Sequence, residues 1–244
     1  MNAITEFNMK KYNNDNEFDE YSKWKNHKKR IEIMLGLVDL AFSRSNIKNK
    51  KSFKIIDIGG NTGVIAKLLK DRGYSASVAD MSELALKTAR KKGIKTYRFD
   101  FNEKFDIDDK KYDLIIAGEV IEHVLDTKLF LDECNRILKK GGFLVLSTPN
   151  LATYNDRIRF LFGSMPRQMN PYHERLKLHI RPFTYKGLKE ALEFSSFKIL
   201  NFKSNYFTIK LGYDKPLFIR FLAIIFPKLS SSLIVLAKKT TVKK

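Results

Sequence analysis

Two short segments of the chain carry the residue types from which a ligand site or a catalytic centre can be built. The first is the sequence DIGGNTG, in which Gly59, Gly60 and Gly63 follow the carboxylate of Asp57. Glycine allows close backbone approach and positive φ angles, and Asn61 is among the few other residue types that adopt the same conformation. Such a loop suits a ligand held against the backbone, while a tight turn that binds nothing would use the same glycines.

The second segment is EVIEH, which contains Glu119, Glu122 and His123. If a helical turn begins at Glu119, the three side chains fall at positions i, i+3 and i+4 and share one face. Two carboxylates and an imidazole on one face can bind a divalent cation or hold the histidine as a general base. The alternative is that the acids only shape the floor of a pocket.

The elements that must position these segments alternate between strands and helices. Short β-rich runs are followed by amphipathic stretches, for which Ser82 and Gly93 provide start and stop signals in one case. This alternation indicates a parallel sheet with helices on both faces. The predicted strands are 53–60, 75–80, 95–101, 112–118 and 143–150, and the predicted helices are 62–73, 82–93 and 127–142.

Less regular segments flank this alternation. Residues 1–18 are polar and rich in asparagine, which predicts a flexible arm, and the apolar period from Glu20 to Phe42 predicts a helical cap. Residues 151–183 contain three prolines and no clean period, which predicts a functional excursion such as a lid. A helix over 183–195 and strands over 197–207 and 231–239 complete the pattern. The predicted organisation is the arm at 1–18 and a single domain at 19–244, divided into a ligand-binding core at 52–150 and a substrate-side insert with C-terminal strands at 151–244.

Two further carboxylates stand at the ends of predicted strands. Asp80 ends the second strand about 20 residues after the glycine loop, where a carboxylate can accept both hydroxyls of a ribose. Asp100 lies at the end of the third strand. Because ligands of open α/β sheets bind at the carboxyl ends of the strands, the loop and both carboxylates predict a nucleoside site at that edge.

The motifs in this order resemble those of class I S-adenosylmethionine-dependent methyltransferases. The loop, read as D-x-G-x-N-x-G, is similar to the D-x-G-x-G-x-G motif of that family, with Asn61 in place of a glycine. VADMSELAL, RFDFNE, YDLIIAGEVIEHVLD and RILKKGGFLVLSTPN resemble the motifs that follow. The resemblance runs from about Ile55 to Asn150, and it is to the ubiquinone-pathway O-methyltransferase and methyltransferase type 11 group. It implies a Rossmann-like α/β fold with a doubly wound, mostly parallel, seven-stranded sheet.

The resemblance also implies S-adenosyl-L-methionine as the cofactor. Asp57 and Gly59 would lie against its methionyl part, Asp80 would hold the ribose hydroxyls, and Asp100 with the backbone of Phe101 would read the adenine amine. The cofactor-binding residues that the resemblance implies are Asp57, Gly59, Gly60, Asn61, Gly63, Asp80, Met81, Asp100, Phe101 and Glu119.

The E-x-x-E-H spacing is similar to a segment of ubiquinone-pathway O-methyltransferases and of small-RNA 2′-O-methyltransferases. In the latter, a histidine beyond the fifth strand completes a metal site, and His179 stands where that residue would be. The resemblance therefore implies a divalent metal held by Glu119, Glu122, His123 and His179. Without a metal, His123 would take the proton of the acceptor directly, with both glutamates beside it as catalytic residues.

The implied reaction is an in-line transfer of the sulfonium methyl group, helped by positioning and desolvation. Oxygen is the expected acceptor, because the amine-methylating D/N-P-P-Y motif is absent after the fourth strand, where the sequence reads AGEV. A small molecule, a sugar or a lipid-linked intermediate is the expected substrate. The alternatives are a metal-dependent RNA 2′-O-methyltransferase, an NAD(P)-dependent oxidoreductase and a non-catalytic nucleoside-binding protein. The oxidoreductase would require a Tyr-x-x-x-Lys pair placed to move a proton.

Composition sets wider bounds. The chain has 244 residues, enough for one α/β domain, and its 43% apolar and 30% charged residues exclude disorder throughout. The single cysteine, Cys134, forms no internal disulfide, and the first residues, MNAITEFNMKKYNNDN, include no apolar leader. A reducing cytoplasm is the predicted compartment.

The net charge of +19 is uneven, because residues 151–244 contain 18 basic and 5 acidic residues. A basic field attracts phosphorylated substrates, nucleic acid or acidic lipid, although scattered lysines also occur on an ordinary solvated surface. Residues 151–183 interleave arginine with aromatic residues, which suits an anionic substrate or single-stranded nucleic acid, or else a helical cap. The apolar stretch 216–229 is expected to be buried, with a dimer face or peripheral membrane contact as alternatives. The oligomeric state is left open.

Overall fold

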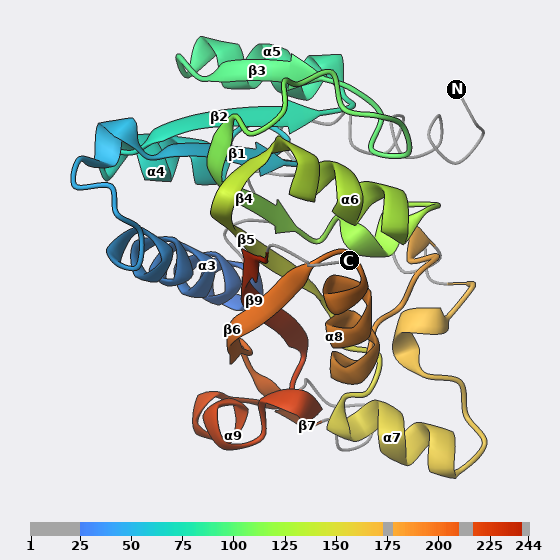
Figure 1. Ribbon diagram of the computed structural model, residues 1–244. Helices are drawn as coiled ribbons and strands as arrows, with labels where there is room; N and C mark the ends of the chain where they lie inside the picture. The colour runs from blue at the N-terminus through green and yellow to red at the C-terminus, as the bar shows by residue number, and fades with distance from the viewer. Residues whose placement is uncertain (1–24, 173–177, 210–216, 241–244) are drawn as a thin grey trace.

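The computed structural model describes residues 25–172, 178–209 and 217–240 (Figure 1). The flexible arm predicted at 1–18 lies outside these residues. None of the helices in this part of the chain combines the length and the apolar character that a membrane span requires.

A seven-stranded sheet forms the centre of the molecule, with the strand order β3-β2-β1-β4-β5-β9-β6. β9 alone runs opposite in direction to the other six strands, so the predicted doubly wound, mostly parallel sheet is confirmed. The order reverses between β1 and β4, and such a switch point opens a crevice at the carboxyl ends of the strands. The strands are β1 (Lys54–Ile58), β2 (Ser75–Asp80), β3 (Lys95–Arg98), β4 (Tyr112–Gly118), β5 (Leu138–Pro149), β6 (Phe197–Lys203) and β9 (Ser232–Lys239).

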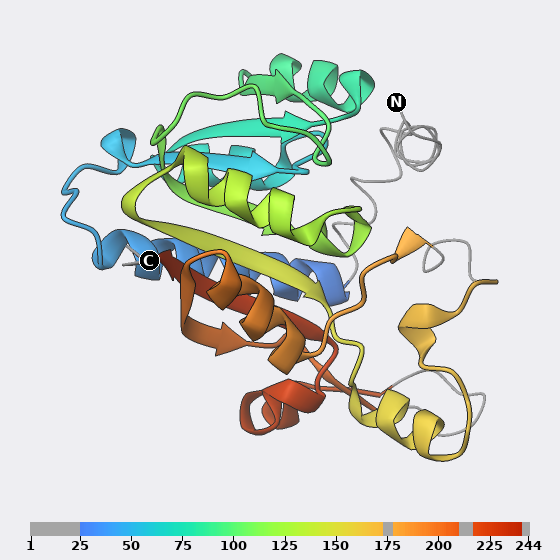
Figure 2. The same ribbon diagram turned by 45° about the vertical axis from the view of Figure 1, so that its right-hand side comes forward.

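Helices cover both faces of this sheet (Figures 1 and 2). Ile55 of β1 packs in a core cluster with apolar residues of one group of helices, whereas Ile56 belongs to a cluster with the other group. This alternation follows from the two-residue period of a strand that is buried on both sides. The first group is α3 (Lys25–Ser43) and α4 (Val64–Asp71), with α5 (Glu83–Lys91) beside them over β2, and the second is α6 (Thr127–Ile137) and α8 (Tyr185–Phe194).

Three predicted boundaries were wrong. The helix predicted at 127–142 ends at Ile137, because Leu138 is already extended and pairs with Tyr112 of β4. The third strand ends at Arg98 instead of residue 101. The strand predicted at 197–207 splits, since β7 (Phe207–Ile209) leaves the main sheet and pairs with β8 (Leu217–Ile219).

The insert after β5 is more regular than its sequence suggested. Thr153 caps the helix α7 (Tyr154–Leu161) by accepting a hydrogen bond from the amide of Asp156. In both views α7 lies at the same end of the molecule as β7 and the helix α9 (Arg220–Ile225) (Figures 1 and 2). The remaining elements are the 3₁₀ turns η1 (Lys50–Ser52), η2 (Ile121–His123), η3 (Arg167–Met169) and η5 (Pro227–Leu229).

Candidate functional site

The glycine loop connects β1 to α4 at the carboxyl edge of the sheet, and its geometry excludes side chains. Gly59 has a φ of 70°, and a Cβ atom there would lie 2.3 Å from Cγ2 of Val120. A Cβ atom on Gly60 would lie 2.6 Å from Oδ2 of Asp57. Asn61 has a φ of 48°, which confirms that it takes the glycine-like conformation expected for it. The loop backbone is therefore wrapped closely around the Asp57 carboxylate.

The Asp57 side chain is 2% exposed. Its Oδ2 atom has no hydrogen-bond partner among the described residues. Burial, together with the nearby Asp80 carboxylate, raises the pKa of Asp57 to about 8. An unpartnered buried carboxylate is costly, and a cation or a hydrogen-bond donor at Oδ2 would relieve that cost. The loop thus presents a site suited to a positively charged group.

Asp80, at the end of β2, ties the loop to the sheet. Its Oδ2 accepts a hydrogen bond from the amide of Asn61, and its Oδ1 accepts one from the amide of Ser82, each at 2.9 Å. Burial raises the pKa of Asp80, while these amides act against that rise. Each carboxylate oxygen has more than one acceptor site, so both can still accept ligand hydroxyls. The sequence indicated a ligand carboxylate here but not its second task of holding the loop.

The turn after β3 carries the next predicted residues. Asp100 lies two residues beyond the strand, half-buried, and accepts hydrogen bonds from both nitrogens of Asn102 at 2.9 Å. The ring of Phe101 is buried and lies edge-on to Phe99, with ring centroids 5.8 Å apart. Met81 is partly buried against the same core cluster. Of these residues, Phe101 is the one shown next to the glycine loop, because its Cε2 atom would lie 3.7 Å from a Cβ atom on Gly59. Contact of all three residues with a cofactor stays a prediction.

Glu119 follows β4 but does not start a helical turn. Its φ is 58°, and the turn η2 begins at Ile121, so the expected sharing of one face with Glu122 and His123 is wrong. Its carboxylate instead forms an ion pair with Arg30, with Nη1 2.8 Å from Oε2, and accepts a hydrogen bond from Ser147 Oγ at 3.1 Å.

Arg30 is a site residue that sequence reasoning missed. It lies on α3, its residue is 7% exposed, and it reaches the carboxyl edge of β4. The one available signal was an arginine that directly precedes the apolar stripe of the cap helix. Pairing keeps the Glu119 charge at the edge of the site partly neutralised.

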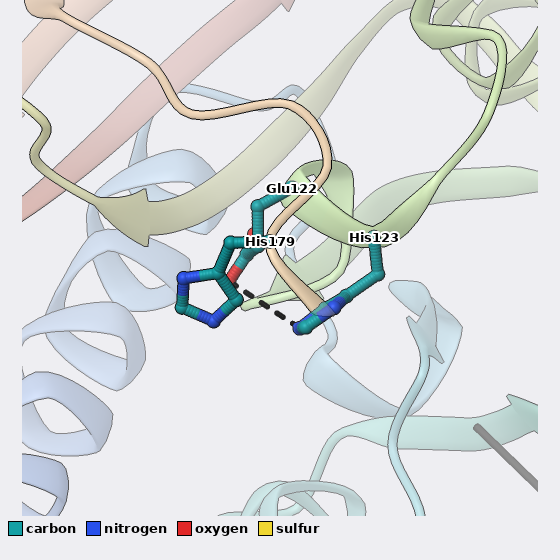
Figure 3. Close-up of side chains that lie close together, drawn as sticks. All are labelled: Glu122, His123 and His179. Carbon is teal, nitrogen blue, oxygen red and sulfur yellow. Dashed lines mark ion pairs between the residues drawn. The ribbon is translucent and has the colours of Figure 1, made fainter. Parts of the chain in front are cut away.

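Glu122, His123 and His179 form a cluster in which one ligand atom from each residue lies within 4.8 Å of the others (Figure 3). Glu122 is 1% exposed, and its Oε2 accepts a hydrogen bond from Thr148 Oγ1 at 3.0 Å. Its Oε1 has no hydrogen-bond partner among the described residues and lies 3.9 Å from His123 Nε2. Burial, and then the charge of Glu119, raise the pKa of Glu122 well above its usual range.

Both histidine rings are oriented through Nδ1. His123 Nδ1 lies 3.0 Å from the carbonyl oxygen of Leu178, and His179 Nδ1 lies 2.9 Å from Oε1 of Gln168. Because these partners are acceptors, each neutral ring carries its proton on Nδ1 and its lone pair on Nε2. The cluster therefore offers two imidazole nitrogens and a buried carboxylate oxygen, which suits a base or a metal ligand set.

Comparison with known proteins gives a family match. Residues 26–201 match the protein family described as "Methyltransferase domain". The chain is 30% identical over 129 residues to "Ubiquinone biosynthesis O-methyltransferase" of Chelativorans sp., covering 46% of this chain and 51% of that protein. It is 26% identical over 175 residues to the protein of the same name from Maricaulis maris, covering 66% and 69%. The first match spans about half the length of the relative.

The fold has counterparts among solved structures. An S-adenosylmethionine-dependent methyltransferase of Thermotoga maritima, described as a possible histamine N-methyltransferase, superposes with a TM-score of 0.60. It covers 93% of this chain and 98% of that one at 19% identity. At that identity the likeness concerns the fold alone.

Proposed function

Because this chain belongs to the methyltransferase-domain family and is an S-adenosylmethionine-dependent methyltransferase, we propose that it methylates an oxygen atom of a small molecule, a sugar or a lipid-linked intermediate. The observation that carries the proposal is the cluster of Glu122, His123 and His179 beside the edge where the cofactor would bind. The name of the curated relatives, O-methyltransferase, supports the same acceptor atom. The match to a methyltransferase family argues against the two other interpretations, an oxidoreductase and a non-catalytic nucleoside-binding protein.

The residues of the sheet edge fit the cofactor. The unpartnered Oδ2 of Asp57 would accept a hydrogen bond from the ammonium of the methionyl part, and the loop at Gly59 would let that part approach the backbone. Asp80 would accept the ribose hydroxyls with Met81 alongside, and Asp100 with the Phe101 amide would meet the adenine. The conformation of the loop would be kept by Gly60, Asn61 and Gly63. The ion pair of Glu119 with Arg30 would form the opposite side of the cofactor site.

The chemistry needs an acceptor that loses a proton. The bound cofactor supplies an electrophilic methyl group. His123, with its Nδ1 proton held by Leu178, would take the hydroxyl proton at Nε2. The imidazolium that forms would lie beside Glu122 Oε1, where its positive charge would favour the ionised form of Glu122 and be stabilised by it. The burial of Glu122 and Ile121 supports a site from which water is excluded around the reacting oxygen.

A divalent metal is a second way to use the same cluster. His123, His179 and Glu122 would hold the ion, and bound metal lowers the pKa of a coordinated hydroxyl. Glu119 lies outside this cluster, so it would contribute only through a change in its pairing with Arg30. This arrangement, with the net charge of +19, favours 2′-O-methylation of RNA as the second candidate function.

The experiment compares acceptors directly. Purified protein and cofactor with a labelled methyl group are incubated with phenolic and catecholic small molecules, with lipid extracts and with tRNA or rRNA. We expect label in the small-molecule or lipid fraction, as an ether stable to mild base, and its loss in the His123→Ala variant. Label only in RNA would establish the second candidate, and methylation of nitrogen would refute the proposed acceptor atom.

A further inference from the structure

Exposed apolar side chains are concentrated in one part of the molecule. Among the described residues, 16 large hydrophobic side chains are exposed, and 13 of them lie within residues 154–172 and 217–226. Leu161, Phe162 and Phe221 are 79%, 78% and 67% exposed. Patches of this kind on soluble domains mark interaction surfaces. The burial expected for residues 216–229 is wrong for α9, in which only Ala223 is buried.

The two segments form one surface, the α7–α9 face, defined here as the exposed apolar residues of 154–172 and 217–226. The hairpin of β7 and β8 joins them. On one side, the Tyr154 ring lies 5.4 Å from that of Phe207, and Asn155 Nδ2 donates to the carbonyl of Thr208 at 2.7 Å. On the other side, Ile219, which leads into α9, pairs with Phe207. Figures 1 and 2 show both helices at the same end of the molecule.

The charge around this face has one sign. Arg157, Arg159, Arg167 and Lys228 are exposed within or beside the two segments. The one acid in described residues 153–172 and 217–229 is Asp156, which is 5% exposed and accepts hydrogen bonds from Thr153 and from the amide of Arg167. The exposed face therefore combines apolar side chains with cations and presents no carboxylate from these segments.

We propose that the α7–α9 face docks the enzyme on the surface of an anionic lipid bilayer. Aromatic and aliphatic side chains enter the headgroup region, and arginine and lysine meet the lipid phosphates, as in interfacial amphipathic helices. A second copy of the chain fits the face less well, because a two-fold contact would bring like charges together on a face whose described segments expose no carboxylate. Both helices are far too short to span a bilayer, so the contact is peripheral.

The position of the α7–α9 face in the fold indicates what the membrane contact would do. Four residues separate the start of α7 from the end of β5, whose Thr148 donates a hydrogen bond to Glu122 of the proposed catalytic cluster. Docking would hold the substrate side of the sheet close to the membrane, where a lipid-linked acceptor is found. This use rests on the proposed function, whereas the docking itself does not.

The test is co-sedimentation with vesicles, measured without cofactor or acceptor. We expect the protein to pellet with vesicles that contain phosphatidylglycerol, much less with pure phosphatidylcholine, and less at high salt. The double variant Phe160→Ser/Phe162→Ser should lower the vesicle partition coefficient roughly tenfold or more. Arg157→Gln/Arg159→Gln should lower it for anionic vesicles only. The matched control is Phe194→Ser, an equally exposed residue on α8, which should bind like the unaltered protein.

The outcomes separate the possible occupants. Failure to bind anionic vesicles, or equal loss in Phe194→Ser, overturns the proposal. So does a dimer in light scattering that Phe160→Ser/Phe162→Ser converts to a monomer, because the face then serves a second copy. Unchanged thermal unfolding of each variant excludes misfolding as the cause. Binding to vesicles in a protein that methylates no lipid fraction leaves docking intact and refutes the lipid-linked acceptor alone.

Discussion

The glycine-loop edge and the α7–α9 face depart from ordinary globular packing in opposite directions. The loop edge buries carboxylates, among them Asp57 and Glu122, each with an oxygen that has no hydrogen-bond partner among the described residues. The α7–α9 face exposes large apolar side chains such as Leu161 and Phe221 to water. Both arrangements cost stability in the isolated protein, because each group lacks its preferred surroundings. From this contrast we infer that the first region suits a cation or a hydrogen-bond donor, whereas the second suits an apolar environment such as the bilayer interior near the headgroups.

The largest effect should come from the proposed catalytic cluster of Glu122, His123 and His179. We expect His123→Ala to lower kcat by about 10²- to 10⁴-fold, since positioned acid–base catalysis contributes that much, with little change in cofactor affinity. Initial rates and calorimetric titration with S-adenosylhomocysteine measure the two quantities. Chelation separates the mechanisms: lost activity that one divalent ion restores supports the metal, and unchanged activity supports His123 as a base. An unimpaired His123→Ala enzyme would remove the cluster from the reaction.

The next effect concerns the cofactor. Asp80→Ala removes both the ribose acceptor and the hydrogen bonds to the amides of Asn61 and Ser82, so we expect S-adenosylhomocysteine affinity to fall by roughly 10- to 100-fold. Asp39→Ala, which alters a surface ion pair with Arg72 far from the ligand edge, is the control and should bind normally. Calorimetry provides the affinities, and normal binding by Asp80→Ala would contradict the assigned edge.

The raised pKa of Asp57 predicts a pH dependence of stability. The folded protein holds this proton up to about pH 8, whereas an unfolded aspartate loses it near pH 4. The stabilisation from the bound proton is therefore complete below about pH 4 and is lost as the pH rises to about 8. Asp57→Asn should flatten this decline in urea unfolding of the cofactor-free protein between those limits. An unchanged slope in the variant would show that another group titrates.

Cofactor binding should offset the cost of the ionised Asp57 carboxylate. If a ligand ammonium meets Asp57, binding at pH 7 releases a proton, and affinity rises toward pH 8 up to about tenfold per pH unit. Titration calorimetry in buffers of different ionisation enthalpy counts the released protons. Asp57→Asn, which carries no titrating carboxyl group, should show less release, and equal release in both proteins would place the ammonium elsewhere.

The smallest effect should be on the exposed face. Phe162→Ser removes a side chain that is already in water, so the free energy of unfolding should change by no more than about 0.5 kcal/mol. By contrast, Phe130→Ala in the core beside Phe101 and Phe105 should cost about 3–5 kcal/mol. Urea denaturation measures both, and a large loss in Phe162→Ser would mean that this part of the chain is core rather than surface.

The sequence alone predicted the order of strands and helices, the glycine loop with Asn61 in a positive φ, and the carboxylates at the sheet edge. These features are local, because strand and helix periods, caps and glycine positions are set by backbone preferences of neighbouring residues. The end of α6 at Ile137 was missed, since pairing of Leu138 with Tyr112 overrides the helical pattern of a lysine-rich stretch.

Tertiary structure alone decided which distant groups meet. The pairing of Arg30 with Glu119 and the exposure of α9 depend on packing between segments far apart in the chain. The approach of His179 to His123 depends on the same kind of packing, and only the family resemblance had implied it. A short sequence window contains the types of these side chains but not their separations or the solvent around them. For that reason the spacing of E-x-x-E-H identified two members of the cluster, Glu122 and His123, whereas Glu119 lies outside the cluster that these two residues form with His179.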